Sequence, residues 1–266
     1  MLTTCVRPTA PTLPDGALPF TPPAVYQQWW SMVESCAGRS APLSAIRWYV
    51  MPGVQSFKRK DMTVAGVWTR ADNSIVLGEY VQFNGHLVRH EMLHAVLQNG
   101  LHPRDAFLER CGGVVTCLQS CLTDAGPADV HVEQTPKVPA TALEVDFELA
   151  PSNPGVLDHE GWFMFVVKAR NPARYPVIVA LPSSAGPLEG RSFGLDVAGP
   201  NVAYRRGARA VDASMIHFEP GETKRYVFDF RLTTGVDGSG LPPGSYKVRA
   251  GYGDNWTSQR QVMLGP

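Results

Sequence analysis

The hydrophobic period of the chain changes part-way along, and this change limits the possible folds more than any other feature. From Leu143 to Leu149 every second residue is apolar and three acids lie between them, a pattern that predicts a half-buried β-strand. Five further strands are expected over residues 162–169, 175–181, 224–232, 245–252 and 259–264. Turns rich in proline and glycine separate them. The sequence therefore predicts an antiparallel β-sandwich from about residue 140 to residue 266.

The first half mixes helical and extended signals. A helix is expected after Thr21, with Trp29 and Trp30 in the core and Gly38 as its stop. Strands are expected over residues 46–51, 64–69 and 74–77. The domains expected are an extended tether over 1–20, a mixed helical and extended domain over 21–126, a linker over 127–139 and the sandwich over 140–266.

The run His90-Glu91-Met92-Leu93-His94 sets two imidazoles one helical turn apart. Asn84 is the expected N-cap of this helix and Asn99-Gly100 the expected stop, so the two histidines share one face. Such a pair can hold zinc, and the adjacent Glu91 is placed to take a proton from a metal-activated water.

A tetrahedral catalytic zinc site needs a third protein ligand. His102 is the first candidate, because a left-handed Gly100 would turn the chain back toward the metal. Asp105 and Glu109 are the alternatives.

The five-residue run resembles the zincin class of metallopeptidases, whose HExxH motif it matches completely. The metzincin extension is not met, since Leu97 and Gly100 stand where that pattern has glycine and histidine. Residues 102–107 are similar to the segment around the third zinc histidine in SprT-like and WLM proteases. The resemblance implies a Zn²⁺ cofactor held by His90, His94 and His102, with Glu91 as general base.

The second half is similar to immunoglobulin-like modules. Its segments 218–222 and 241–246 are similar to the last hairpin of the BsuPI type of small sandwich. The fold class expected is therefore an α+β zincin-like catalytic domain with a short sheet and an HExxH helix, followed by an all-β immunoglobulin-like sandwich.

Two disulfides are expected among four of the five cysteines, and the pairing stays open. These four are Cys36, Cys111, Cys117 and Cys121. Disulfides favour an extracytoplasmic protein, either secreted or attached to the cell envelope. Residues 2–5 resemble the end of a bacterial lipoprotein signal, which would lipidate Cys5 and tether the chain to a membrane, although no charged or apolar signal region precedes them.

The charge balance argues against nucleic acid as a partner. The chain has 24 basic and 24 acidic residues, and no stretch concentrates enough cations to follow a phosphate backbone. Lys58-Arg59-Lys60 is expected to be a solvated turn, and His131, His159 and His217 ordinary histidines. No apolar run approaches the roughly 20 residues of a membrane span.

Two functions remain open from the sequence. The first is a zinc-dependent peptidase acting on peptide or protein substrates, in which Glu91 activates a metal-bound water. The alternative is an envelope-associated binding or scaffold protein with a non-catalytic zinc site and an adhesive β-sandwich.

Overall fold

The structure is a computed structural model that describes residues 13–117, 135–151, 161–180, 191–199, 202–209, 215–232 and 240–265. The chain divides into two compact units, Met1–His102 and Pro103–Pro266. The division therefore falls earlier than the linker expected over 127–139, of which the structure describes only 135–139.

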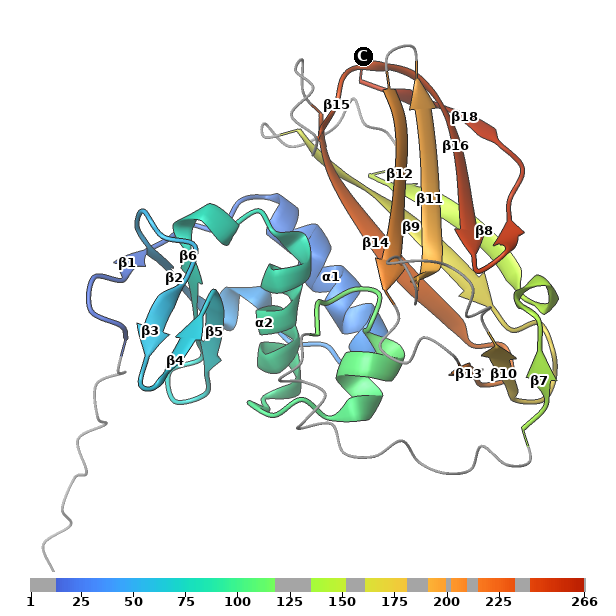
Figure 1. Ribbon diagram of the computed structural model, residues 1–266. Coiled ribbons are helices and arrows are strands. Elements are labelled where there is room, and N and C mark those ends of the chain that lie inside the picture. Colours follow the sequence, from blue (N-terminus) through green and yellow to red (C-terminus); the bar gives the residue numbers. More distant parts are fainter. Residues whose placement is uncertain are drawn as a thin grey trace, which may run out of the picture. The chain divides into compact units, whose positions relative to one another are not determined.

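The first unit is built on a four-stranded sheet with the order β1-β2-β6-β5 (Figure 1). Its strands are β1 (Leu18–Pro19), β2 (Arg47–Met51), β5 (Gly66–Thr69) and β6 (Ser74–Gly78). β2 and β6 are parallel, whereas β5 runs antiparallel to β6. The three strands expected in this half are present with ends shifted by up to two residues, but residues 18–19, expected in a free tether, pair with β2.

A separate hairpin and two α-helices complete this unit. The hairpin joins β3 (Phe57–Arg59) to β4 (Met62–Val64), and short 3₁₀ turns cover Leu43–Ala45 and Glu79–Val81. Helix α1 (Val25–Ala37) has no side-chain cap from Thr21, because its N-cap is Ala24, and it ends at a left-handed Gly38. Trp29 and Trp30 are fully buried, as expected.

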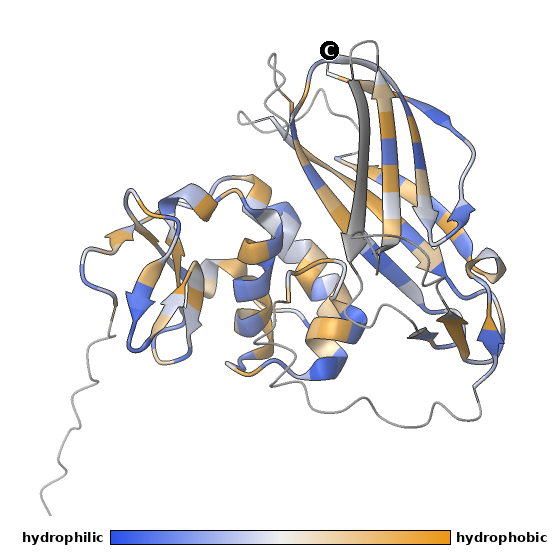
Figure 2. Cartoon of the chain, in the orientation of Figure 1, coloured by the Kyte–Doolittle hydropathy of each residue, from blue (hydrophilic) through white to orange (hydrophobic). Residues whose placement is uncertain are grey.

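Helix α2 (Gly85–Leu97) carries both hydrophobic and hydrophilic residues (Figure 2). Val88, Met92 and Leu93 are inaccessible to solvent, so the apolar side of the helix is part of the core of the first unit. Burial of these side chains stabilises the helix by about 1.5–3 kcal/mol each. The same packing fixes the direction in which the polar side chains of α2 point.

The second unit begins with a π-helical segment, Asp105–Arg110, and a 3₁₀ turn, Ala140–Ala142. One sheet has the order β15-β14-β9-β8 and another the order β12-β11-β16-β17, with β18 also paired to β16. A three-stranded sheet has the order β13-β10-β7. The strands are β7 (Lys137–Val138), β8 (Glu144–Ala150), β9 (Trp162–Arg170), β10 (Val177–Ala180), β11 (Arg191–Gly199), β12 (Val202–Arg209), β13 (Met215–Phe218), β14 (Thr223–Leu232), β15 (Gly240–Leu241), β16 (Gly244–Tyr252), β17 (Asn255–Trp256) and β18 (Arg260–Leu264).

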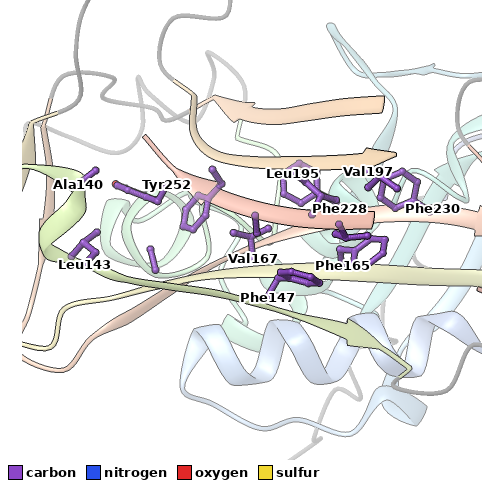
Figure 3. Close-up of a cluster of buried hydrophobic side chains, with 14 of the residues drawn as sticks. Ala140, Leu143, Phe147, Phe165, Val167, Leu195, Val197, Phe228, Phe230 and Tyr252 are labelled. Atoms are coloured by element: carbon purple, nitrogen blue, oxygen red, sulfur yellow. The ribbon is translucent and has the colours of Figure 1, made fainter. Parts of the chain in front are cut away.

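The core of the second unit is aromatic and aliphatic (Figure 3). Phe165 of β9 has ring contacts with Phe147, Phe163 and Phe230 at centroid distances of 5.8–6.0 Å. Phe147 is buried because β8 alternates as the sequence indicates, although Val145 and Leu149 on the same face are only half-buried.

The expected fold class, an α+β zincin-like catalytic domain followed by an immunoglobulin-like sandwich, is wrong. Strands account for 42% and helices for 22% of the structure, so several sheets rather than a helix-dominated catalytic domain define it. The error has a physical cause. A five-residue motif fixes one local helix and says nothing about the sheets around it.

Candidate metal centre

Helix α2 begins and ends through local hydrogen bonds. The side chain of Asn84 accepts a hydrogen bond from the backbone N–H of Leu87 at 3.3 Å, which confirms the expected N-cap. The left-handed residue at the other end is Gln98, with φ of 52°, and not Gly100 as expected. The reversal at Gln98 turns the chain back along the helix. His102 therefore approaches α2 without a left-handed glycine at position 100.

The structure brings His90, His94 and His102 together. Their Nε2 atoms form a triangle in which each pair is separated by 3.2 Å. With Zn–N bonds of about 2.0–2.1 Å and tetrahedral angles, two nitrogen ligands lie about 3.3–3.4 Å apart. The donor type and spacing of this triad therefore fit a zinc ion.

A backbone carbonyl orients the buried member of this triad. Nδ1 of His94 lies 2.7 Å from the carbonyl oxygen of Asn99, a geometry that assigns the proton to Nδ1 and leaves the Nε2 lone pair available to a metal. Burial lowers the pKa of His94 to about 4, opposed by the Asn99 bond and assisted by His102. The ring is thus neutral at pH 7, the form that binds metal.

Two members of the triad are accessible to solvent. His94 is buried, whereas His90 and His102 are half-buried. A metal held here by three protein ligands would keep a position for water or substrate, as catalytic zinc sites do.

Glu91 contacts strand β5. Its Oε2 accepts a hydrogen bond from the backbone N–H of Trp68 at 2.8 Å. Burial raises the pKa of Glu91 to about 7, although the Trp68 N–H and the charge of Arg59 both lower it. A carboxyl group that titrates near neutrality can both accept and return a proton.

Strand β5 is shaped to hold this carboxylate. A side chain at Gly66 would place Cβ 3.0 Å from Cγ of Glu91 and 3.1 Å from Leu77 and Leu87, so glycine leaves the space that Glu91 occupies. The indole of Trp68 lies parallel to the His94 ring at 6.4 Å and donates from Nε1 to Asn73 at 3.0 Å. β5 therefore contacts both Glu91 and His94.

The alternative third ligands are engaged elsewhere. Oε1 of Glu109 lies 3.2 Å from Nε of Arg104, and Oδ2 of Asp105 lies 2.9 Å from Nη2 of Arg110. Both carboxylates belong to the second unit, and neither joins the cluster of candidate ligands in the described part of the chain.

Sequence reasoning missed the residues that orient this site. Gly66, Trp68 and Asn99 act through backbone atoms or through the absence of a side chain, and residue type reveals neither. Only Asn99 gave a signal, as part of the expected helix stop.

Cys36, Cys111 and Cys117 are disulfide-bonded. Their pairing stays open, because Cys121 lies outside the described residues, as do Cys5, His131 and His159.

His217 is exposed, with Nε2 3.8 Å from Oε1 of Glu219. No described helix has the length and apolar character needed to cross a membrane.

No family model matches the chain, and no curated protein matches it. Among solved structures it is similar to an alkylpurine DNA glycosylase from Pseudomonas fluorescens, at 7% identity and a TM-score of 0.30 over 47% of this chain and 31% of that one. A β-glucosidase from Erythrobacter marinus shares 14% identity at a TM-score of 0.26, over 46% of this chain and 15% of that one. The chain thus spans less than a third of either protein.

A Bordetella pertussis protein with a provisional ApaA assignment shares 16% identity at a TM-score of 0.25, over 46% of this chain and 90% of that one. At these TM-scores the similarities carry no information about function. The chemistry of the site has to be argued from its own residues.

Proposed function

We propose that the protein is a zinc-dependent peptidase that hydrolyses peptide bonds. The observation that carries this proposal is the triangle of Nε2 atoms of His90, His94 and His102, with 3.2 Å sides, beside a buried carboxylate. Bound zinc would polarise a carbonyl group and lower the pKa of a water molecule toward about 7.

Glu91 is the general base in this proposal. One of its oxygens is held by the Trp68 N–H, and among the described residues Oε1 has no protein hydrogen-bond partner. Oε1 is therefore available to a water molecule. It accepts a proton from this water and later returns a proton to the products of hydrolysis.

Strand β5 is the proposed binding surface for the substrate backbone. It stands at the end of the described sheet order, with β6 on one side. Extended peptides add to such strands through main-chain hydrogen bonds. The same strand holds Glu91, so a peptide bond placed there would lie close to the base.

We place the protein outside the cytoplasm, either secreted or attached to the cell envelope. The disulfide-bonded state of Cys36, Cys111 and Cys117 supports this, because disulfides persist mainly in oxidising compartments. A lipid tether at Cys5 remains a part of this proposal that only the sequence supports.

The test compares the wild type with Glu91→Gln, using Glu109→Gln as the matched control. Zinc content is measured by mass spectrometry and turnover with casein and quenched peptides. We expect about one zinc per chain in all three proteins and a fall in kcat of about 10²–10⁴-fold in Glu91→Gln alone.

Two results would contradict the proposal. Wild-type protein that carries zinc but hydrolyses neither casein nor peptides would favour the binding or scaffold alternative. Hydrolysis that survives in Glu91→Gln would show that the base has been misassigned.

A further inference from the structure

The β3–β4 hairpin carries three consecutive cations, and the structure separates them. Arg59 pairs with Met62 across the hairpin, and Lys60, with φ of 50°, begins the turn. Because side chains alternate along a strand, Arg59 shares a face with buried Phe57, whereas Lys58 lies on the other face. Lys58 and Lys60 are exposed and Arg59 is half-buried, so the expected solvated turn describes only the lysines.

The guanidinium of Arg59 is anchored on strand β5. Its Nη2 donates to Oγ1 of Thr69 at 3.1 Å. Thr69 follows Trp68, the residue whose N–H holds Glu91. The hairpin thereby fixes a cation on Thr69, the residue next to the one whose N–H holds the proposed general base.

Arg59 has no carboxylate partner among the described residues. Its charge lowers the pKa of Glu91, but no ion pair joins the two. In the described part of the chain, arginines paired with carboxylates include Arg104, Arg110, Arg170, Arg249 and Arg260. The Thr69 contact uses one of the five N–H donors of a guanidinium, which leaves donors for a further acceptor. A half-buried guanidinium with this geometry suits a carboxylate.

Arg59 lies on the side where one set of side chains of a peptide paired with β5 would be found. The Trp68 ring lies on the face of β5 that contacts His94, so the next side chain, Thr69, lies on the opposite face. A peptide paired with β5 would present every second side chain on the face of Thr69, where Arg59 is anchored.

We propose that Arg59 is a substrate-recognition residue that binds a carboxylate of a peptide lying along β5, and that acidic peptides are therefore the preferred substrates. This inference rests on the proposed peptidase function for the peptide itself. The carboxylate belongs either to an Asp or Glu side chain or to the C-terminus of the peptide.

The test measures binding rather than turnover. Peptidyl hydroxamates chelate zinc through the hydroxamate, whatever side chains accompany it. A series is made with Glu or Gln at successive positions and an amidated C-terminus, and a further set has Gln and a free C-terminal carboxylate. Dissociation constants are measured by competition with zinc-loaded wild type, Arg59→Gln and Lys58→Gln. Lys58→Gln removes the same charge from the exposed face of the same strand.

We expect wild type to bind the carboxylate-bearing member of one pair about tenfold more tightly than its neutral partner, a difference typical of one charge-assisted contact. Arg59→Gln should abolish this preference and Lys58→Gln should retain it. Preference confined to the free-acid set would assign the carboxylate to the C-terminus.

Equal affinities for charged and neutral members in the wild type would overturn the proposal. An equal loss of preference in Lys58→Gln would also overturn it, because diffuse positive charge would then explain the effect. Selective binding without hydrolysis of any peptide would leave Arg59 as a recognition residue and refute the peptidase function separately.

Discussion

The two units differ in what they bury. Four of the five buried polar or charged residues in the described part of the chain lie in the first unit, and the second unit contributes one. They are Ser74, Arg89, Glu91 and His94 in the first unit and Asn171 in the second. Burying polar groups costs stability unless they are well paired. Two of the four, Glu91 and His94, belong to the candidate metal centre, so the first unit carries a cost of polar burial that the described part of the second unit largely avoids.

The largest effect is expected in the apolar core of the second unit. Phe165→Ala removes a fully buried ring with three aromatic neighbours, and we expect the free energy of unfolding to fall by about 3–5 kcal/mol. Urea denaturation measures the change, with the exposed Tyr175→Ala as control, expected within about 0.5 kcal/mol. Folded Phe165→Ala should keep the zinc affinity of the wild type. A large loss of zinc affinity would break the proposed separation of roles.

A smaller effect with the opposite sign is expected at Glu91 in metal-free protein. Because burial raises its pKa from 4.5 to about 7, the folded state favours the neutral carboxyl, and stability present below pH 4.5 is lost as the pH rises through 7. Glu91→Gln keeps an acceptor for the Trp68 N–H but never ionises. The variant should therefore be more stable than the wild type by up to about 3 kcal/mol at pH 8 and nearly equal to it at pH 4.

Thermal unfolding in the presence of a chelator, at both pH values, measures this difference. Glu109→Gln serves as the control, since its side chain is 51% exposed. A stability difference for Glu91→Gln that does not change with pH would mean that the buried carboxylate carries no such cost.

The smallest effect is expected at the start of α2. Asn84→Ala removes the side-chain acceptor for the Leu87 N–H and should lower stability by about 1 kcal/mol. Ser31→Ala on the exposed side of α1 is the control. Because His90 and His94 lie about two to three turns further along the helix, zinc affinity should change less than stability. A larger change in zinc affinity than in stability would show that the cap orients the two histidines of the helix.

Local signals predicted the helices and many strands. The period of 3.6 and the Asn84 cap located α2, and strict alternation located β8. Strands β11 and β12 were missed, since glycine and alanine interrupt their patterns. The expected fold class was wrong for a different reason. The motif around His90 specifies one local helix, whereas the fold class depends on the sheets around that helix.

The candidate site was predictable only in part. His90, His94 and His102 could be chosen because metal ligands are recognised by residue type and spacing. Contacts between distant segments could not be predicted from the sequence. Glu91 contacts the backbone of Trp68, and Arg59 contacts Thr69, because of the way the β-strands pair and fold. Residue type alone does not encode such register.

The central claim is that three histidines of the first unit together bind zinc. Competition titration of zinc against a chromogenic chelator tests it, with wild type, His102→Ala and Glu109→Ala measured side by side. We expect about one zinc per wild-type chain, a loss of affinity of at least about 100-fold in His102→Ala, and no change in Glu109→Ala. Wild-type protein that binds no zinc, or a His102→Ala variant that binds it as tightly as the wild type, would contradict the account.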